Sequence, residues 1–87
     1  MARTDKRLRK MRENPRDWRI ETLQSIADSL GIAWLHDGGS HVIFRSPYGE
    51  HLSIPAHRPI KPIYIAKFLA LTDSTQEMKD EHSKKQN

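Results

Sequence analysis

Apolar residues recur along this chain at two different spacings, and the change from one to the other marks the expected elements. Between residues 14 and 31 they recur every three or four positions, as on one face of a helix: Ile20, Leu23, Ile26, Ala27 and Leu30. Asn14-Pro15 suits the first turn of a helix, and Gly31 suits its end. The spacing therefore predicts a helix that starts at residues 14–15 and stops at Gly31.

Residues 32–57 show the alternation that is typical of strands. The run 32–36 is short and rich in large residues, which predicts a first strand. Residues 39–45 and 51–57 predict two more strands. In the first of these, side chains alternate between faces, so one face carries His41, Ile43 and Arg45.

A turn centred on Tyr48 decides how these two strands pair. Pro47 suits the first central position of a type I turn, and Gly49 can adopt the left-handed conformation that closes a three-residue loop. The expected pairs are Phe44 with Leu52, Val42 with Ile54, and Arg45 with His51. The apolar sets then share one face, and His41 lies with Arg45 and His51 on the face open to water.

A second helix is expected from residue 62 or 63 to residues 71–73, with Ile65, Phe68 and Leu69 on its apolar side. The chain divides into a basic N-terminal arm (1–13), a folded domain (14–73) and a polar C-terminal tail (74–87). We expect the arm to be frayed or weakly helical and the tail to be disordered or loosely attached. The element order predicts an α+β domain, α-β-β-β-α, with two helices on one face of a three-stranded antiparallel sheet. This is the topology of the double-stranded-RNA-binding domain.

Positive charge is concentrated at the N-terminus. Residues 1–19 hold eight Lys or Arg against three acids, whereas the whole chain has a net charge of +4. A basic arm suits a nucleic acid partner, and it equally suits a solubilising tail. The chain has no cysteine, which excludes disulfides and thiolate metal sites and is compatible with a reducing cytoplasm. No apolar run approaches membrane-spanning length, so no membrane association is expected.

Three features of the sequence resemble the HicA family, the small toxins of bacterial and archaeal toxin–antitoxin systems. They are Gly39-Ser40-His41 before an apolar strand ending in Phe44, the run Leu52-Ser53-Ile54-Pro55-Ala56-His57, and a leading helix that closes on Leu30-Gly31-Ile32. The resemblance covers roughly residues 14–72. The chain departs from the family in having no basic residue directly before Gly39 and no Gly-Thr at the start of the last helix.

The resemblance implies a double-stranded-RNA-binding-like fold and a cytoplasmic mRNA interferase. Such an enzyme is a metal-independent endoribonuclease, held inactive by a HicB antitoxin in a hetero-oligomer. His41 matches the family's catalytic histidine. His57 matches the histidine of its Pro-x-His motif.

RNA cleavage without a metal needs a base for the 2′-hydroxyl proton, an acid for the departing 5′ oxygen, and positive charge at the phosphate. Histidine suits the proton transfers because its unperturbed pKa is about 6.5. His41 is our first choice, with Arg45, His51 and His57 as supporting candidates. The candidate RNA contacts are Ser40, Arg45 and Lys61. The histidine spacing does not indicate a metal site, and no cofactor is expected.

Two other hypotheses stay open at this point. The same sheet face and the basic arm suit an RNA-binding module without catalysis. An exposed sheet face also suits a protein that only contacts another subunit. Each histidine likewise has a plain role as a surface residue, and His57 equally suits a cap on the loop backbone.

Overall fold

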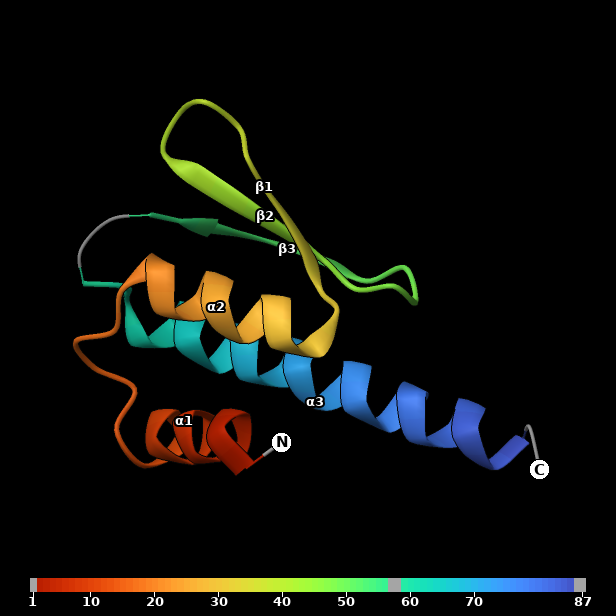
Figure 1. The fold of residues 1–87 in the computed structure, drawn as a ribbon. Helices are drawn as coiled ribbons and strands as arrows, with labels where there is room; N and C mark the ends of the chain where they lie inside the picture. The colour runs from red at the N-terminus through yellow and green to blue at the C-terminus, as the bar shows by residue number, and fades with distance from the viewer. Residues whose placement is uncertain (1, 57–58, 86–87) are drawn as a thin grey trace.

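The computed structural model describes the backbone of residues 2–56 and 59–85 and the side chains of residues 6–56 and 59–78. Within these ranges the chain forms three helices and three strands (Figure 1). In order they are α1 (Ala2–Glu13), α2 (Ile20–Leu30), β1 (Ala33–His36), β2 (His41–Arg45), β3 (His51–Pro55) and α3 (Pro62–Lys85). The α+β class and the three strands agree with the prediction, and α1 adds a well-formed third helix.

The three strands form an antiparallel sheet in the order β1-β2-β3. The β2–β3 pairing has the predicted register: Phe44 with Leu52, Val42 with Ile54, and Arg45 with His51. Gly49 takes a φ of 105°, and its N–H donates to the carbonyl of Ser46 at 3.2 Å, which closes the turn. A local turn and a buried apolar face together specify this register, because a slip of one residue would turn the buried set outward.

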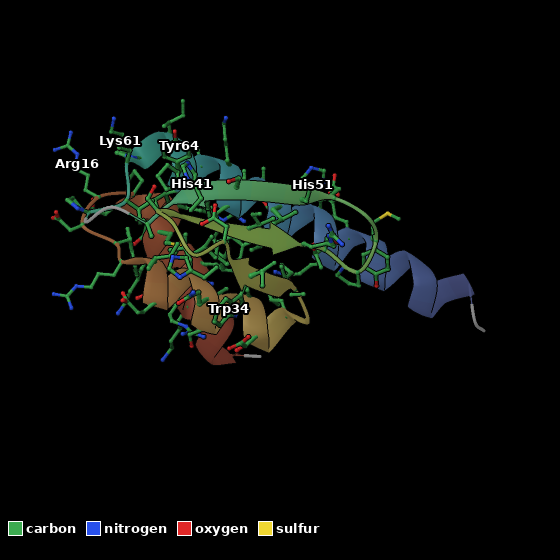
Figure 2. All side chains as sticks on the ribbon, turned by 90° about the horizontal axis from the view of Figure 1, so that it is seen from above. Arg16, Trp34, His41, His51, Lys61 and Tyr64 are labelled. Carbon is green, nitrogen blue, oxygen red and sulfur yellow. The ribbon has the colours of Figure 1, made fainter. Side chains whose placement is uncertain are left out.

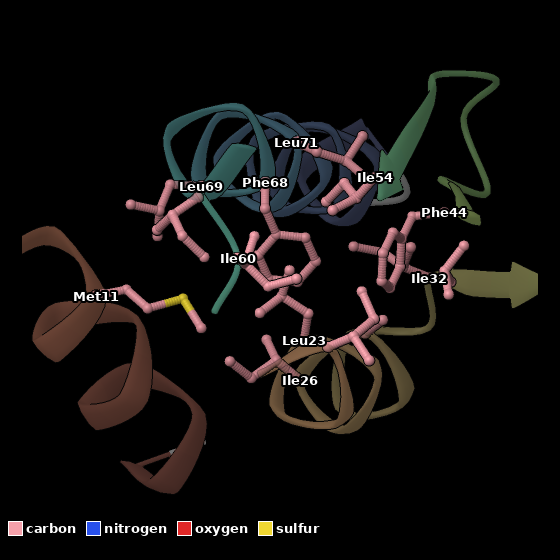
Figure 3. Packing of buried hydrophobic residues seen from close by; sticks show 14 of the residues in the cluster. Met11, Leu23, Ile26, Ile32, Phe44, Ile54, Ile60, Phe68, Leu69 and Leu71 are labelled. Atoms are coloured by element: carbon pink, nitrogen blue, oxygen red, sulfur yellow. The ribbon is translucent and has the colours of Figure 1, made fainter. Parts of the chain in front are cut away.

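Helices α2 and α3 cover one face of the sheet, and α1 packs on the far side of those two helices (Figure 1). The main core lies between the sheet and the helix pair. There Phe44 of β2 meets Phe68 of α3 edge to face, with ring centroids 5.3 Å apart. Figure 3 shows Leu23 and Ile26 of α2 in the same cluster, which Met11 approaches from α1. The opposite face of the sheet has no helix of the described chain over it.

The expectation of a frayed or weakly helical N-terminal arm is wrong, because residues 2–13 form α1, which is docked through two apolar residues. Leu8 and Met11 lie one helical turn apart, and Met11 has 0% of its surface exposed. Arg12 pairs with Asp73 of α3, and the Arg7 guanidinium donates to the Ser25 hydroxyl at 3.0 Å. The ion pair is exposed and contributes at most about 1 kcal/mol. Apolar burial therefore supplies most of the docking energy.

The first predicted helix begins later than expected, at Ile20 instead of residues 14–15. The segment before it turns sharply, and Asp17 adopts a left-handed φ of 63° that ends any continuous helix. The Trp18 indole N–H donates to the Asn14 carbonyl at 2.6 Å, and the Trp18 carbonyl accepts from the N–H of Ile60 at 2.9 Å. Long-range contact with residue 60 thus outweighs the local Asn-Pro start signal.

Helix α3 continues to Lys85, well beyond the expected end at residues 71–73. Two threonines lie inside it with their hydroxyls satisfied by the helix itself. Thr72 donates to the Leu69 carbonyl and Thr75 to the Leu71 carbonyl, each at 2.8 Å. Both side chains are buried, so they extend the packed face past Leu71. Residues 74–85, for which disorder or loose attachment was expected, are therefore helical.

Candidate functional site

His41 is the first residue of β2 and lies exposed on the face of the sheet that bears no helix. Its cross-strand partner is Pro55, and Ile43 and Arg45 follow it on the same face. Since Val42 beside it is buried, the alternation along the strand keeps the imidazole on the open side. The prediction that His41 faces water is confirmed.

The tight connection before His41 is built by Asp37. Its backbone N–H donates to the His41 carbonyl at 3.2 Å, and its carboxylate accepts from the Gly39 N–H at 2.8 Å. Gly38 takes a φ of 83°, a conformation that favours glycine. The Ser40 carbonyl accepts from the Ala56 N–H at 2.6 Å, which joins this connection to the end of β3. His41 is therefore held by backbone contacts on both sides.

Asp37 also has a shifted pKa. The hydrogen bond from the Gly39 N–H lowers the pKa of the Asp37 carboxyl below its ordinary value, against a smaller opposing effect of desolvation. The His41 backbone and the charges of His41 and His36 act in the same direction as Gly39. Asp37 is thus ionised at neutral pH and close enough to His41 for their charges to interact.

Arg45 and His51 do not join His41, contrary to the expectation that the three would lie together. They pair with each other at the opposite end of the hairpin. Arg45 lies four positions after His41 in the strand, which is about 13 Å at the usual rise. Figure 2 shows His41 and His51 at opposite ends of the sheet. His41 and the Arg45–His51 pair therefore do not form one compact group.

A different set of residues lies at the His41 end of the sheet. Figure 2 places Arg16, Lys61 and Tyr64 there. The sequence had singled out Lys61 but not Arg16 or Tyr64. Nothing local in the sequence points to Arg16, because a contact between residues 18 and 60 brings its segment to this place.

Ser40 is exposed beside His41, and its demonstrated contact is through its backbone carbonyl. The predicted role of His57 lies outside the described residues. Within the described chain, no group of three or more His, Asp or Glu side chains is arranged to hold a metal ion. None of the helices described here is long and apolar enough to cross a membrane.

The middle of the open sheet face is apolar. Leu35 of β1 pairs with Ile43 of β2, and 66% of the Leu35 surface is exposed. Trp34, on the other side of β1, is 38% exposed and donates its indole N–H to the Asp28 carboxylate at 2.9 Å. The basic helix α1 lies on the opposite side of the molecule from this face (Figure 1), so the two do not form one continuous surface.

Comparison with known proteins adds no further assignment. No protein-family model, no curated protein and no solved structure matches the chain.

Proposed function

We propose that this protein is a HicA-like mRNA interferase, a metal-independent endoribonuclease with His41 as its catalytic residue. Counted from α2, the element order α-β-β-β-α and the two helices on one sheet face support the double-stranded-RNA-binding-like topology that the resemblance implies. Fold order alone does not indicate an activity, so the proposal depends on the site.

The exposure of His41 on the open sheet face is the observation that carries the proposal. An RNA backbone can approach an imidazole that stands at a strand end beside a turn with two glycines. There the imidazole takes the 2′-hydroxyl proton or gives a proton to the departing 5′ oxygen. A histidine buried under α2 or α3 would have no such access.

The second proton transfer needs a group near His41, and the structure changes the candidates for it. Arg45 and His51 lie at the other end of the hairpin, so neither stands beside His41. Asp37 lies close to His41 and is ionised at neutral pH. We therefore assign the second transfer to water positioned by Asp37 or to another group at this end of the sheet.

The proposal includes a HicB-like antitoxin that covers the His41 face in a cytoplasmic hetero-oligomer. The exposed Leu35 and its partner Ile43 support a protein contact here, since they form an apolar centre on the face that also bears His41. Such a contact would exclude RNA from His41 without changing the catalytic residue.

The test is cleavage of a labelled mRNA in the presence of EDTA by the parent and by His41→Ala. We expect the variant to cut about 10²–10⁴-fold more slowly, the usual contribution of a general acid or base. His51→Ala is the matched control, because it removes an exposed histidine from the other end of the same face. An unchanged rate for His41→Ala, with both proteins folded by circular dichroism, would show that His41 is not catalytic.

The second candidate function is an RNA-binding module without catalysis. The separation of His41 from the Arg45–His51 pair favours it, because these groups are not gathered in one compact catalytic site. This candidate predicts that RNA is retained by the parent and by His41→Ala and is left whole by both.

A further inference from the structure

A cavity of about 530 Å³ opens beside the His41 end of the sheet, at the start of α3. Two segments distant in sequence form its walls. The α1–α2 connection contributes Arg16 and Asp17, and the segment from the end of β3 to the first turn of α3 contributes Pro55, Lys61 and Tyr64. The volume falls in the range of about 300–1,000 Å³ that is typical of small-ligand pockets.

Pro55 joins this cavity to the proposed catalytic residue. It lines the cavity and is also the cross-strand partner of His41. Side chains of directly opposed residues on one sheet face stand about 5 Å apart at Cβ. Figure 2 shows Arg16, Lys61 and Tyr64 at the same end as His41. A ligand in the cavity would therefore extend toward His41 and away from His51.

Hydrogen bonds hold the two walls together. The Ile60 N–H donates to the Trp18 carbonyl at 2.9 Å, and Ile60 is buried. The Trp18 indole N–H fixes the same connection by donating to Asn14 at 2.6 Å. The cavity is thus formed before any ligand arrives, which reduces the ordering cost of binding.

The wall chemistry matches a nucleotide. Tyr64 and the neighbouring prolines offer a flat apolar surface of the kind on which bases stack. Arg16 and Lys61 are exposed cations at the rim, where α3 also begins with the positive end of its dipole. Lys67 does not line the cavity, but its ammonium lies over the Tyr64 ring, 5.9 Å from the ring centroid. Asp17 is the one acid in the lining that the structure describes, and its carboxylate can accept hydrogen bonds from base N–H groups.

We propose that this cavity holds one unpaired nucleotide of single-stranded RNA, with its base against Tyr64 and its phosphate at Arg16 and Lys61. The inference rests on the proposed function and adds to it a binding subsite for the RNA strand. The bound nucleotide anchors the strand so that a neighbouring phosphate lies at His41. Asp17 favours bases that present an exocyclic amino donor over uracil, which has none.

The test measures binding separately from cutting. A fluorescent single-stranded RNA with 2′-O-methyl groups cannot undergo attack by its own 2′ oxygen, so its anisotropy reports affinity alone. We expect Tyr64→Ala to weaken binding about 5- to 100-fold, as removal of a stacking ring does, and Tyr64→Phe to keep most of the affinity. Tyr48→Ala, which removes a tyrosine from the β2–β3 turn at the other end, is the matched control and should bind like the parent.

The charged rim has its own readout. Arg16→Ala should lower the slope of log affinity against log salt by about 0.7, the value for one phosphate contact on a single strand. Arg9→Ala removes an exposed arginine from α1 and should leave the slope unchanged. Equal affinity of the parent and Tyr64→Ala would overturn the inference. The inference would also be overturned if an acidic peptide displaced the labelled RNA at the same concentration at which unlabelled RNA displaces it.

One further measurement needs no variant. Addition of nucleoside 5′-monophosphates to the labelled parent protein should shift the NMR signals of Arg16, Lys61 and Tyr64, and shifts confined to other residues would contradict the assignment. Tyr64-dependent binding by a protein that never cuts RNA would overturn the proposed function and leave this inference standing. Cutting that depends on His41, together with an RNA affinity that Tyr64→Ala leaves unchanged, would overturn this inference and leave the proposed function standing.

Discussion

The contribution of α1 to the free energy of unfolding can be predicted, because the docking of this helix depends on the burial of two apolar side chains. Met11 is fully buried in the main cluster, so Met11→Ala removes a buried side chain and leaves a cavity. Truncations of this kind cost about 2–5 kcal/mol. α1 is an end segment and can detach, which limits the loss, so we expect about 2–3 kcal/mol. For a domain of this size that corresponds to a fall of about 10–20 °C in Tm.

The assay is thermal and urea unfolding followed by circular dichroism, with Arg9→Ala as the control on the exposed side of the same helix. Arg9→Ala should change the unfolding free energy by less than about 0.5 kcal/mol. If the loss reflects detachment of α1, adding Leu8→Ala to Met11→Ala should cost less than the two single variants together. A Tm for Met11→Ala within 2 °C of the parent, about the scale of a neutral surface change, would refute the docking of α1.

Two further stability predictions concern the turns that position the hairpin. Gly49→Ala should lower the free energy of unfolding in urea by about 1–2 kcal/mol, because a residue with a Cβ is strained at a φ of 105° and the added methyl group makes no contact that would offset the strain. Gly39 lies outside the positive-φ region, so Gly39→Ala should lower the free energy of unfolding by less. Asp37→Asn should lower Tm at neutral pH. The pKa of Asp37 is lowered in the folded state, so the ionised carboxylate stabilises the fold at pH values above its ordinary pKa of 3.8. The difference in Tm between parent and variant should therefore vanish as pH falls through the lowered pKa. A constant difference down to low pH would contradict this cause.

The hairpin was predictable because the signals that specify it are local. The turn around Tyr48 and the alternation of Val42, Phe44 and Ile54 admit one register with a buried apolar face. The separation of His41 from Arg45 was also available from the sequence, since four residues of strand have a known length. This separation follows when the rise per residue of a strand is applied to the candidate site residues as well as to the core residues.

The docked α1 and the cavity could not be inferred from local patterns. Leu8 and Met11 give too little apolar surface to predict a stable helix, and their burial depends on the surfaces of α2 and α3. Arg16 reaches the His41 end because Trp18 bonds to Ile60, a contact across 42 residues of chain (60 minus 18). That contact also moves the start of α2 from Asn14-Pro15 to Ile20.

Whether His41 cuts RNA without a metal is best tested by the chemistry of the RNA ends. A single-turnover reaction in EDTA is followed on labelled RNA and on the same strand with 2′-O-methyl groups. We expect cutting of the first strand alone, with 2′,3′-cyclic phosphate and 5′-hydroxyl ends, and loss of this cutting in His41→Ala. Cutting that persists in His41→Ala, products with 3′-hydroxyl ends, or RNA left whole by the folded parent would contradict it.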